Sequence, residues 1–244
     1  MKKIIKNAIS IFLFLLLGIS TALLVYLHFF APGDTDLSGE WSTDLDMTEQ
    51  AAVTALNWLQ DIEAVSLSLE EMESYMQKLT IQVNMTMEET ERSKGTFQCY
   101  IVPDSYDACN QAAYEAFARG FRELLGERLR MAGYAGGTGQ EDMETLVAET
   151  FGMSTVSYLM SCGPALLPSF KDLQAQYEGS GTYEIVEDVL IRQFGDGGAA
   201  AIKEERYIRK DTDLVLLREG GSAIFDSSFD SYPIIYTLQH PIDR

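Results

Sequence analysis

The N-terminal segment contains a run of 24 residues, 8–31, without Asp, Glu, Lys or Arg. As a helix rising about 1.5 Å per residue it would be roughly 36 Å long, enough to cross a hydrocarbon core of about 30 Å. A cleavable signal peptide has a shorter apolar core and then a small-x-small site in a polar segment. Here apolar residues 23–27 follow Ser20-Thr21-Ala22, and Pro32 follows Ala31. We therefore predict that residues 1–33 form a cytoplasmic tip and a transmembrane anchor, with a cleaved signal peptide as the alternative.

Basic residues near the ends of this run predict its orientation. Lys2, Lys3 and Lys6 precede it, and no basic residue follows until Lys78. Because basic residues mark the cytoplasmic side, we expect a single-pass protein of the cell membrane with a cytoplasmic N-terminus. Residues 34–244 would then form an extracellular α+β domain.

Charge restricts the partners of that outer domain. Three of the 18 basic residues precede the run, so the remainder carries 15 Lys and Arg against 37 Asp and Glu, a net charge of −22. Such a field repels nucleic acid and anionic lipid headgroups and attracts cations or basic peptides. An acidic surface that serves only solubility explains the same composition. The predicted partners are the membrane, through the N-terminal helix, and an unknown protein or small apolar ligand, but no nucleic acid.

Hydropathy periodicity predicts an α+β fold built on an antiparallel sheet. Helical spacing follows a short first strand, and a polar turn at 88–95 joins two alternating strands. Pro103 opens a helical insertion at about 103–177, and short turns then separate the strands of a meander. The expected strands lie at 39–45, 79–87, 96–102, 179–188, 189–194, 204–210, 213–219 and 232–239, with the first helix near 47–64.

Three segments resemble the lipocalin-like (calycin) proteins of bacteria. Gly39-Glu40-Trp41 is similar to the Gly-x-Trp start of that family, and residues 179–194 and 205–219 are similar to its late strands. The resemblance implies a lipocalin-like sheet or partial barrel in which Trp41 plugs one end. It also implies an arginine near the last strand that stacks on the tryptophan, for which Arg218 and Arg244 are the candidates. The family has no helical block of this size between its third and fourth strands.

Cysteine and histidine usage restricts the chemistry. Cys99 and Cys109 fall on apolar faces and are expected in the core, where a bridge between them remains an alternative; Cys162 is the third cysteine. The histidines are His28, inside the apolar run, and His240 near the C-terminus, too few for a zinc cluster. We predict no catalytic residues, no metal, no cofactor and no enzyme activity. A carboxylate-dependent envelope hydrolase and a purely structural tether are the alternatives.

Calcium at Asp34 and Asp36 is a further open alternative. The segment Asp34-Thr35-Asp36-Leu37-Ser38-Gly39 matches the first half of a calcium loop, but its twelfth position is Leu45 where a bidentate Glu is required. Asx-turns account for the same residues.

Aromatic residues in the predicted sheet are the candidate ligand contacts. Tyr183 and Tyr207, together with Trp41, offer apolar area, and the tyrosines add a polar tip. Ordinary sheet packing is the commoner role of such tyrosines, and a core plug explains Trp41. The sequence as a whole predicts a membrane-anchored, extracytoplasmic binding or interaction protein of the bacterial envelope.

Overall fold

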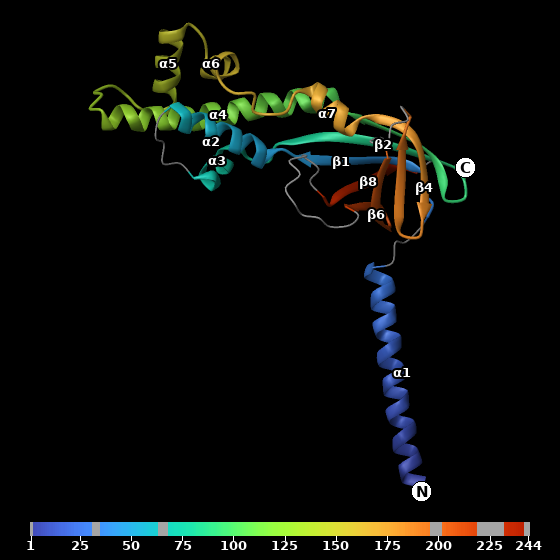
Figure 1. Cartoon of the computed structure of the whole chain (residues 1–244). Helices are drawn as coiled ribbons and strands as arrows, with labels where there is room; N and C mark the ends of the chain where they lie inside the picture. Colours follow the sequence, from blue (N-terminus) through green and yellow to red (C-terminus); the bar gives the residue numbers. More distant parts are fainter. Residues whose placement is uncertain (1, 31–34, 63–67, 196–201, 219–231, 242–244) are drawn as a thin grey trace. The chain divides into compact units, whose positions relative to one another are not determined.

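A computed structural model of the chain describes residues 2–30, 35–62, 68–195, 202–218 and 232–241 (Figure 1). In chain order its helices and strands are α1 (Lys2–Phe30), β1 (Gly39–Asp46), α2 (Thr48–Ile62), α3 (Leu69–Met76), β2 (Thr80–Glu91), β3 (Lys94–Ile101), α4 (Pro103–Met131), α5 (Gln140–Phe151), α6 (Thr155–Cys162), α7 (Phe170–Tyr177), β4 (Gly179–Val186), β5 (Val189–Phe194), β6 (Ile202–Lys210), β7 (Asp213–Arg218) and β8 (Ile234–His240).

The eight strands form one closed barrel in which each strand bonds to its neighbour in sequence. The β4–β8 part is an antiparallel meander, with Tyr183 opposite Arg192 and Tyr207 opposite Leu216. Alternation of buried and exposed residues, unbroken along β3, directs every second side chain inward. The predicted antiparallel α+β fold is confirmed, and the sheet is a closed barrel where the sequence predicted only a sheet or partial barrel. Closure leaves no unpaired edge strand.

The β2–β3 hairpin differs from the prediction. The polar stretch 88–95 was expected to be a turn, but β2 continues to Glu91 and β3 begins at Lys94, leaving only Arg92 and Ser93 in the turn. Ser93 adopts a φ of 63°, and its amide donates to Glu89 Oε1 at 3.0 Å. Backbone pairing in a barrel continues through polar residues because it does not depend on their side chains.

Backbone contacts divide the chain into two compact units, which we describe separately. The helical unit comprises residues 42–85 and 98–179, and the barrel unit comprises 1–41, 86–97 and 180–244. Helices α4 to α7 follow β3 and precede β4, in the part of the chain where the sequence predicted a helical insertion. In the helical unit, α2 begins where Asp46 Oδ1 accepts from the Thr48 amide at 2.9 Å. Its core includes Leu45, Met47, Leu59, Met72, Ile81, Ile101, Phe117, Leu159 and Leu173.

The first helix, α1, runs without a break from Lys2 to Phe30. Its described side chains, those of residues 12–26, are exposed and mostly apolar. Among the described residues, however, no helix has the length and apolarity that crossing a membrane requires. The structure therefore does not support the predicted transmembrane helix.

The cysteines carry free thiols. Cys99 and Cys109 are buried and unbridged, as expected for core residues, whereas Cys162 is exposed. Burial raises the pKa of the Cys109 thiol to about 11, and the nearby negative charge of Asp46 adds to this effect. Cys109 is therefore a packing residue and a poor nucleophile at neutral pH.

The candidate calcium residues are only partly covered by the structure. Asp34 lies outside the described residues. Asp36 Oδ1 accepts from the Ser38 amide at 3.0 Å, which is the Asx-turn that the sequence offered as the alternative.

Candidate functional site

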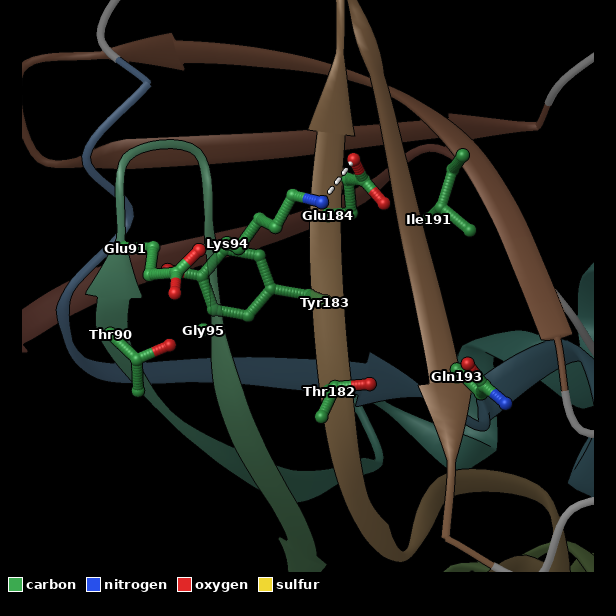
Figure 2. A pocket seen from close by; sticks show the side chains of 9 residues that line it. All are labelled: Thr90, Glu91, Lys94, Gly95, Thr182, Tyr183, Glu184, Ile191 and Gln193. Carbon is green, nitrogen blue, oxygen red and sulfur yellow. Dashed lines mark ion pairs between the residues drawn. The ribbon is translucent and has the colours of Figure 1, made fainter.

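A pocket of about 350 Å³ lies on the barrel unit, where residues of β2, β3, β4 and β5 come together (Figure 2). This volume is at the small end of the range for ligand sites, about 300 to 1,000 Å³. Its lining residues are Thr90, Glu91, Lys94, Gly95, Thr182, Tyr183, Glu184, Ile191 and Gln193. Of the three predicted ligand residues, only Tyr183 belongs to this set.

Tyr183 reaches the pocket because β3 has a glycine beside it. Figure 2 shows the ring of Tyr183 extending from β4 toward Gly95. A Cβ atom at Gly95 would lie 2.6 Å from the Tyr183 ring and would also collide with the carbonyl oxygen of Glu88. A side chain at Gly95 would therefore displace the ring or the backbone of β2. Tyr183 itself is only 3% exposed, so it forms a wall of the pocket and not its rim.

An ion pair crosses the rim of the pocket. Lys94 Nζ lies 2.8 Å from Glu184 Oε1, and the two side chains are 51% and 48% exposed. The hydrogen bond to Glu184, followed by the charge of that carboxylate, raises the pKa of Lys94. Lys94 is therefore cationic at neutral pH. With Glu91, Thr182 and Gln193, the lining offers charges of both signs together with hydroxyl and amide groups.

A second polar cluster is buried in the barrel unit. Arg192 Nε and Nη2 donate to Glu205 Oε2 and Oε1, both at 2.8 Å, and the Tyr232 hydroxyl donates to Glu205 Oε1 at 2.7 Å. The guanidinium of Arg192 lies 5.7 Å and 5.9 Å from the ring centroids of Phe97 and Phe194. Arg192 and Glu205 are 5% and 1% exposed. The two charges therefore compensate each other, as a buried pair must.

Sequence reasoning missed this buried pair, although a signal for it was present. Arg192 stands two residues after Leu190, and Glu205 two residues before Tyr207, so strand alternation places both charges on inward faces. Two opposite charges on inward positions of neighbouring strands are a recognisable pattern. Each alone looks like a surface residue.

Trp41 is a core residue, and the arginine that stacks on it is neither of the two that the sequence suggested. It is 1% exposed, and its Nε1 donates to the carbonyl oxygen of Leu37 at 2.9 Å. The guanidinium of Arg209, on β6, lies 4.7 Å from the centroid of the Trp41 ring. The arginine found on Trp41 is thus neither of the two candidates: Arg218 is the register partner of Glu205, and Arg244 lies outside the described residues, so its part of the expectation is not tested. The resemblance placed the arginine near the last strand, whereas closure of the barrel brings β6 to this position.

Tyr207 is 1% exposed and is not among the residues that line the pocket. Ligand contact by Tyr207 and Trp41 stays a prediction. Within the described part of the chain, no group of three or more His, Cys, Asp and Glu side chains is placed to hold a metal ion.

No known protein-family model, curated protein or solved structure matches the chain. The closed antiparallel eight-strand barrel is consistent with a lipocalin-like fold.

Proposed function

We propose that this protein is a non-enzymatic binding protein of the bacterial envelope that takes a small polar zwitterion into the Lys94–Glu184 pocket. The single observation that carries the proposal is a pocket of ligand size with charges of both signs around its opening. A ligand with a carboxylate and an ammonium group, such as a short peptide, matches that lining.

The polar lining favours such a ligand over the small apolar ligand expected from the sequence. Lys94 and Glu184 are about half exposed, so their mutual attraction is weakened by water. A ligand carboxylate can therefore replace Glu184 as the partner of Lys94 at small cost. Its ammonium group can then pair with Glu184 or Glu91, while Tyr183 supplies a flat apolar wall.

The proposed setting is the outer face of a membrane to which α1 attaches the barrel. The support is the apolar, exposed surface of residues 12–26 and the three lysines that precede it. The proposed lipocalin-like assignment has the support of the closed barrel and of the cation–π contact of Arg209 with Trp41.

Calorimetric titration of the full chain in lipid nanodiscs tests the binding proposal. The probe is the dipeptide Ala-Ala, and its N-acetylated and C-amidated forms each lack one of the two charges. We expect Ala-Ala to bind, and either modification to weaken binding about tenfold, the effect of losing roughly 1.4 kcal/mol. Lys94→Gln should weaken binding of Ala-Ala similarly, whereas the matched change at exposed Lys78, Lys78→Gln, should have no effect.

Three outcomes would overturn the proposal. Ala-Ala does not bind, or Lys94→Gln binds it as tightly as the unmodified protein, or the protein cleaves it. Cleavage would revive the alternative of a carboxylate-dependent hydrolase.

A further inference from the structure

The corner that joins α5 to α6 in the helical unit exposes apolar side chains. Phe151 at the end of α5 is 48% exposed and Met153 in the connection is 40% exposed. The Phe151 ring stacks on Tyr158 of α6, with centroids 4.4 Å apart and ring planes at 29°. Ser161 Oγ donates to Met153 Sδ at 3.9 Å and lies 3.4 Å from the exposed Cys162 Sγ. We call Phe151, Met153, Tyr158 and Cys162 the α5–α6 patch.

The backbone under this patch is well ordered by local contacts. Gly152 adopts a left-handed φ of 73°, which ends α5, and Ser154 Oγ accepts from the Ser157 amide at 3.2 Å, which begins α6. Glu144 of α5 accepts from the Thr155 amide at 3.1 Å. Figure 1 shows α5 and α6 beside α4, which both of them contact. The patch is therefore held in shape before any partner arrives, which lowers the entropy cost of binding.

Scattered exposed apolar residues are ordinary on protein surfaces. The α5–α6 patch differs from such scattered residues because two of its aromatic rings, Phe151 and Tyr158, stack on each other while Phe151 remains half exposed. Aromatic and methionine side chains are also the residues that interfaces favour, since methionine adapts its shape to a partner.

Charge around the patch identifies the kind of partner. Residues 131–170, which include α5 and α6, contain no Lys or Arg but contain Glu141, Asp142, Glu144 and Glu149. Glu144 is already paired with Arg122 of α4, whereas Glu149, two residues before Phe151, is exposed. With a net charge of −22 beyond α1, a second copy of the chain or an anionic lipid surface would be repelled. A cationic segment with an apolar face would be attracted and would cover the rings.

We propose that the α5–α6 patch is a docking surface for a basic amphipathic helix of a partner protein. The apolar face of that helix covers Phe151, Met153 and Tyr158, and its Lys or Arg residues face the exposed acidic side chains of α5, such as Glu149. This surface belongs to the helical unit and does not depend on the ligand pocket.

Photo-crosslinking from Cys162 tests this proposal. Cys162 is exposed while Cys99 and Cys109 are buried, so a benzophenone maleimide labels it in the native full chain in nanodiscs. The probe is an amphipathic Leu/Lys peptide, and the controls are a Gly/Lys peptide of equal charge and a Leu/Glu peptide. We expect crosslinks with Leu/Lys only, and weaker binding at high salt because salt screens the charges.

Variants separate the patch from general attraction to an acidic protein. Phe151→Ser should weaken Leu/Lys binding about tenfold, as loss of a central interface side chain does. The matched change at another exposed apolar residue, Val53→Ser on α2, should leave it unchanged. Equal binding by the Phe151→Ser protein, or equal crosslinking of Gly/Lys, would overturn the proposal. Crosslinks joining two copies of the chain, or crosslinks to the nanodisc lipid, in the absence of peptide would also overturn it.

Discussion

Trp41 and Arg209 lie far apart in the sequence, on β1 and β6, yet they form one cation–π contact of 4.7 Å. The Trp41 ring is almost fully buried, and its only polar atom, Nε1, is satisfied by Leu37. A tryptophan in this setting contributes both apolar burial and the attraction of a cation to its ring. The contribution of Trp41 to the stability of the fold can therefore be measured by truncating its side chain.

Trp41→Ala should lower the free energy of unfolding by about 3 to 5 kcal/mol, because it removes a large buried side chain and leaves a cavity. Trp41→Phe should cost less, since it keeps an aromatic ring and loses mainly the hydrogen bond to Leu37. Urea denaturation of the two variants measures both effects. A near-neutral Trp41→Ala would show that the ring does not pack as described.

At the scale of helices, Glu144 joins three elements of the helical unit. Its carboxylate lies 2.6 Å from Arg122 Nη1 of α4 and accepts from the Thr155 amide, the first residue of α6. Burial tends to raise the pKa of Glu144, but hydrogen bonds from Thr155, and then the hydrogen bond and charge of Arg122, together lower it. The ionised form is thus the one that holds α4, α5 and α6 together.

The pH dependence of stability should report this contact. A carboxyl with a lowered pKa in the folded state stabilises above its unfolded pKa, near 4.5, and loses that contribution as pH falls through the folded pKa. Glu144→Gln should therefore cost about 1 kcal/mol at pH 7, a modest value because the pair is partly exposed and screened by water. The difference from the unmodified protein should shrink as the solution is acidified below pH 4.5.

Urea titrations at neutral and acidic pH measure that difference. Glu149→Gln is the matched control on the same helix, because Glu149 is exposed, and it should have little effect at either pH. An equal cost for Glu144→Gln at both pH values would contradict the role of the ionised carboxylate.

At the scale of the whole molecule, the proposed arrangement places a strongly acidic domain outside the cell. The lysines precede the apolar run and the excess of Asp and Glu follows it, as expected if the two ends of the run lie on opposite sides of the membrane. The Lys94–Glu184 pocket and the α5–α6 patch would then both face the envelope space.

Protease added to intact, wall-stripped cells should digest residues 34–244 and leave an N-terminal fragment protected by the membrane. An antibody to a tag at the N-terminus and one to the barrel would detect the two parts separately. A mature protein that begins near residue 23 or 32 and is released to the medium would contradict attachment through α1.

Much of the secondary structure was determined by the sequence alone. Alternation along β3, the Pro103 start of α4 and the capping Asp46 each depend on residues within a few positions, and the structure has these elements where the pattern predicted them. The burial of Cys99 and Cys109 followed from the same periodicity. Local patterns are reliable here because side-chain direction repeats every 2.0 residues in a strand and every 3.6 in a helix.

Only the tertiary structure decided which distant residues meet. Closure of the barrel, the choice of Arg209 for Trp41, the Arg192–Glu205 pair and the pocket beside Gly95 all depend on strand order and register. Periodicity says that a side chain points inward but not which strand it faces, because shifting the register by two residues preserves the pattern and changes every partner. The helices and strands of this protein are therefore determined by short stretches of sequence. Its candidate site depends instead on which strands pair and in which register.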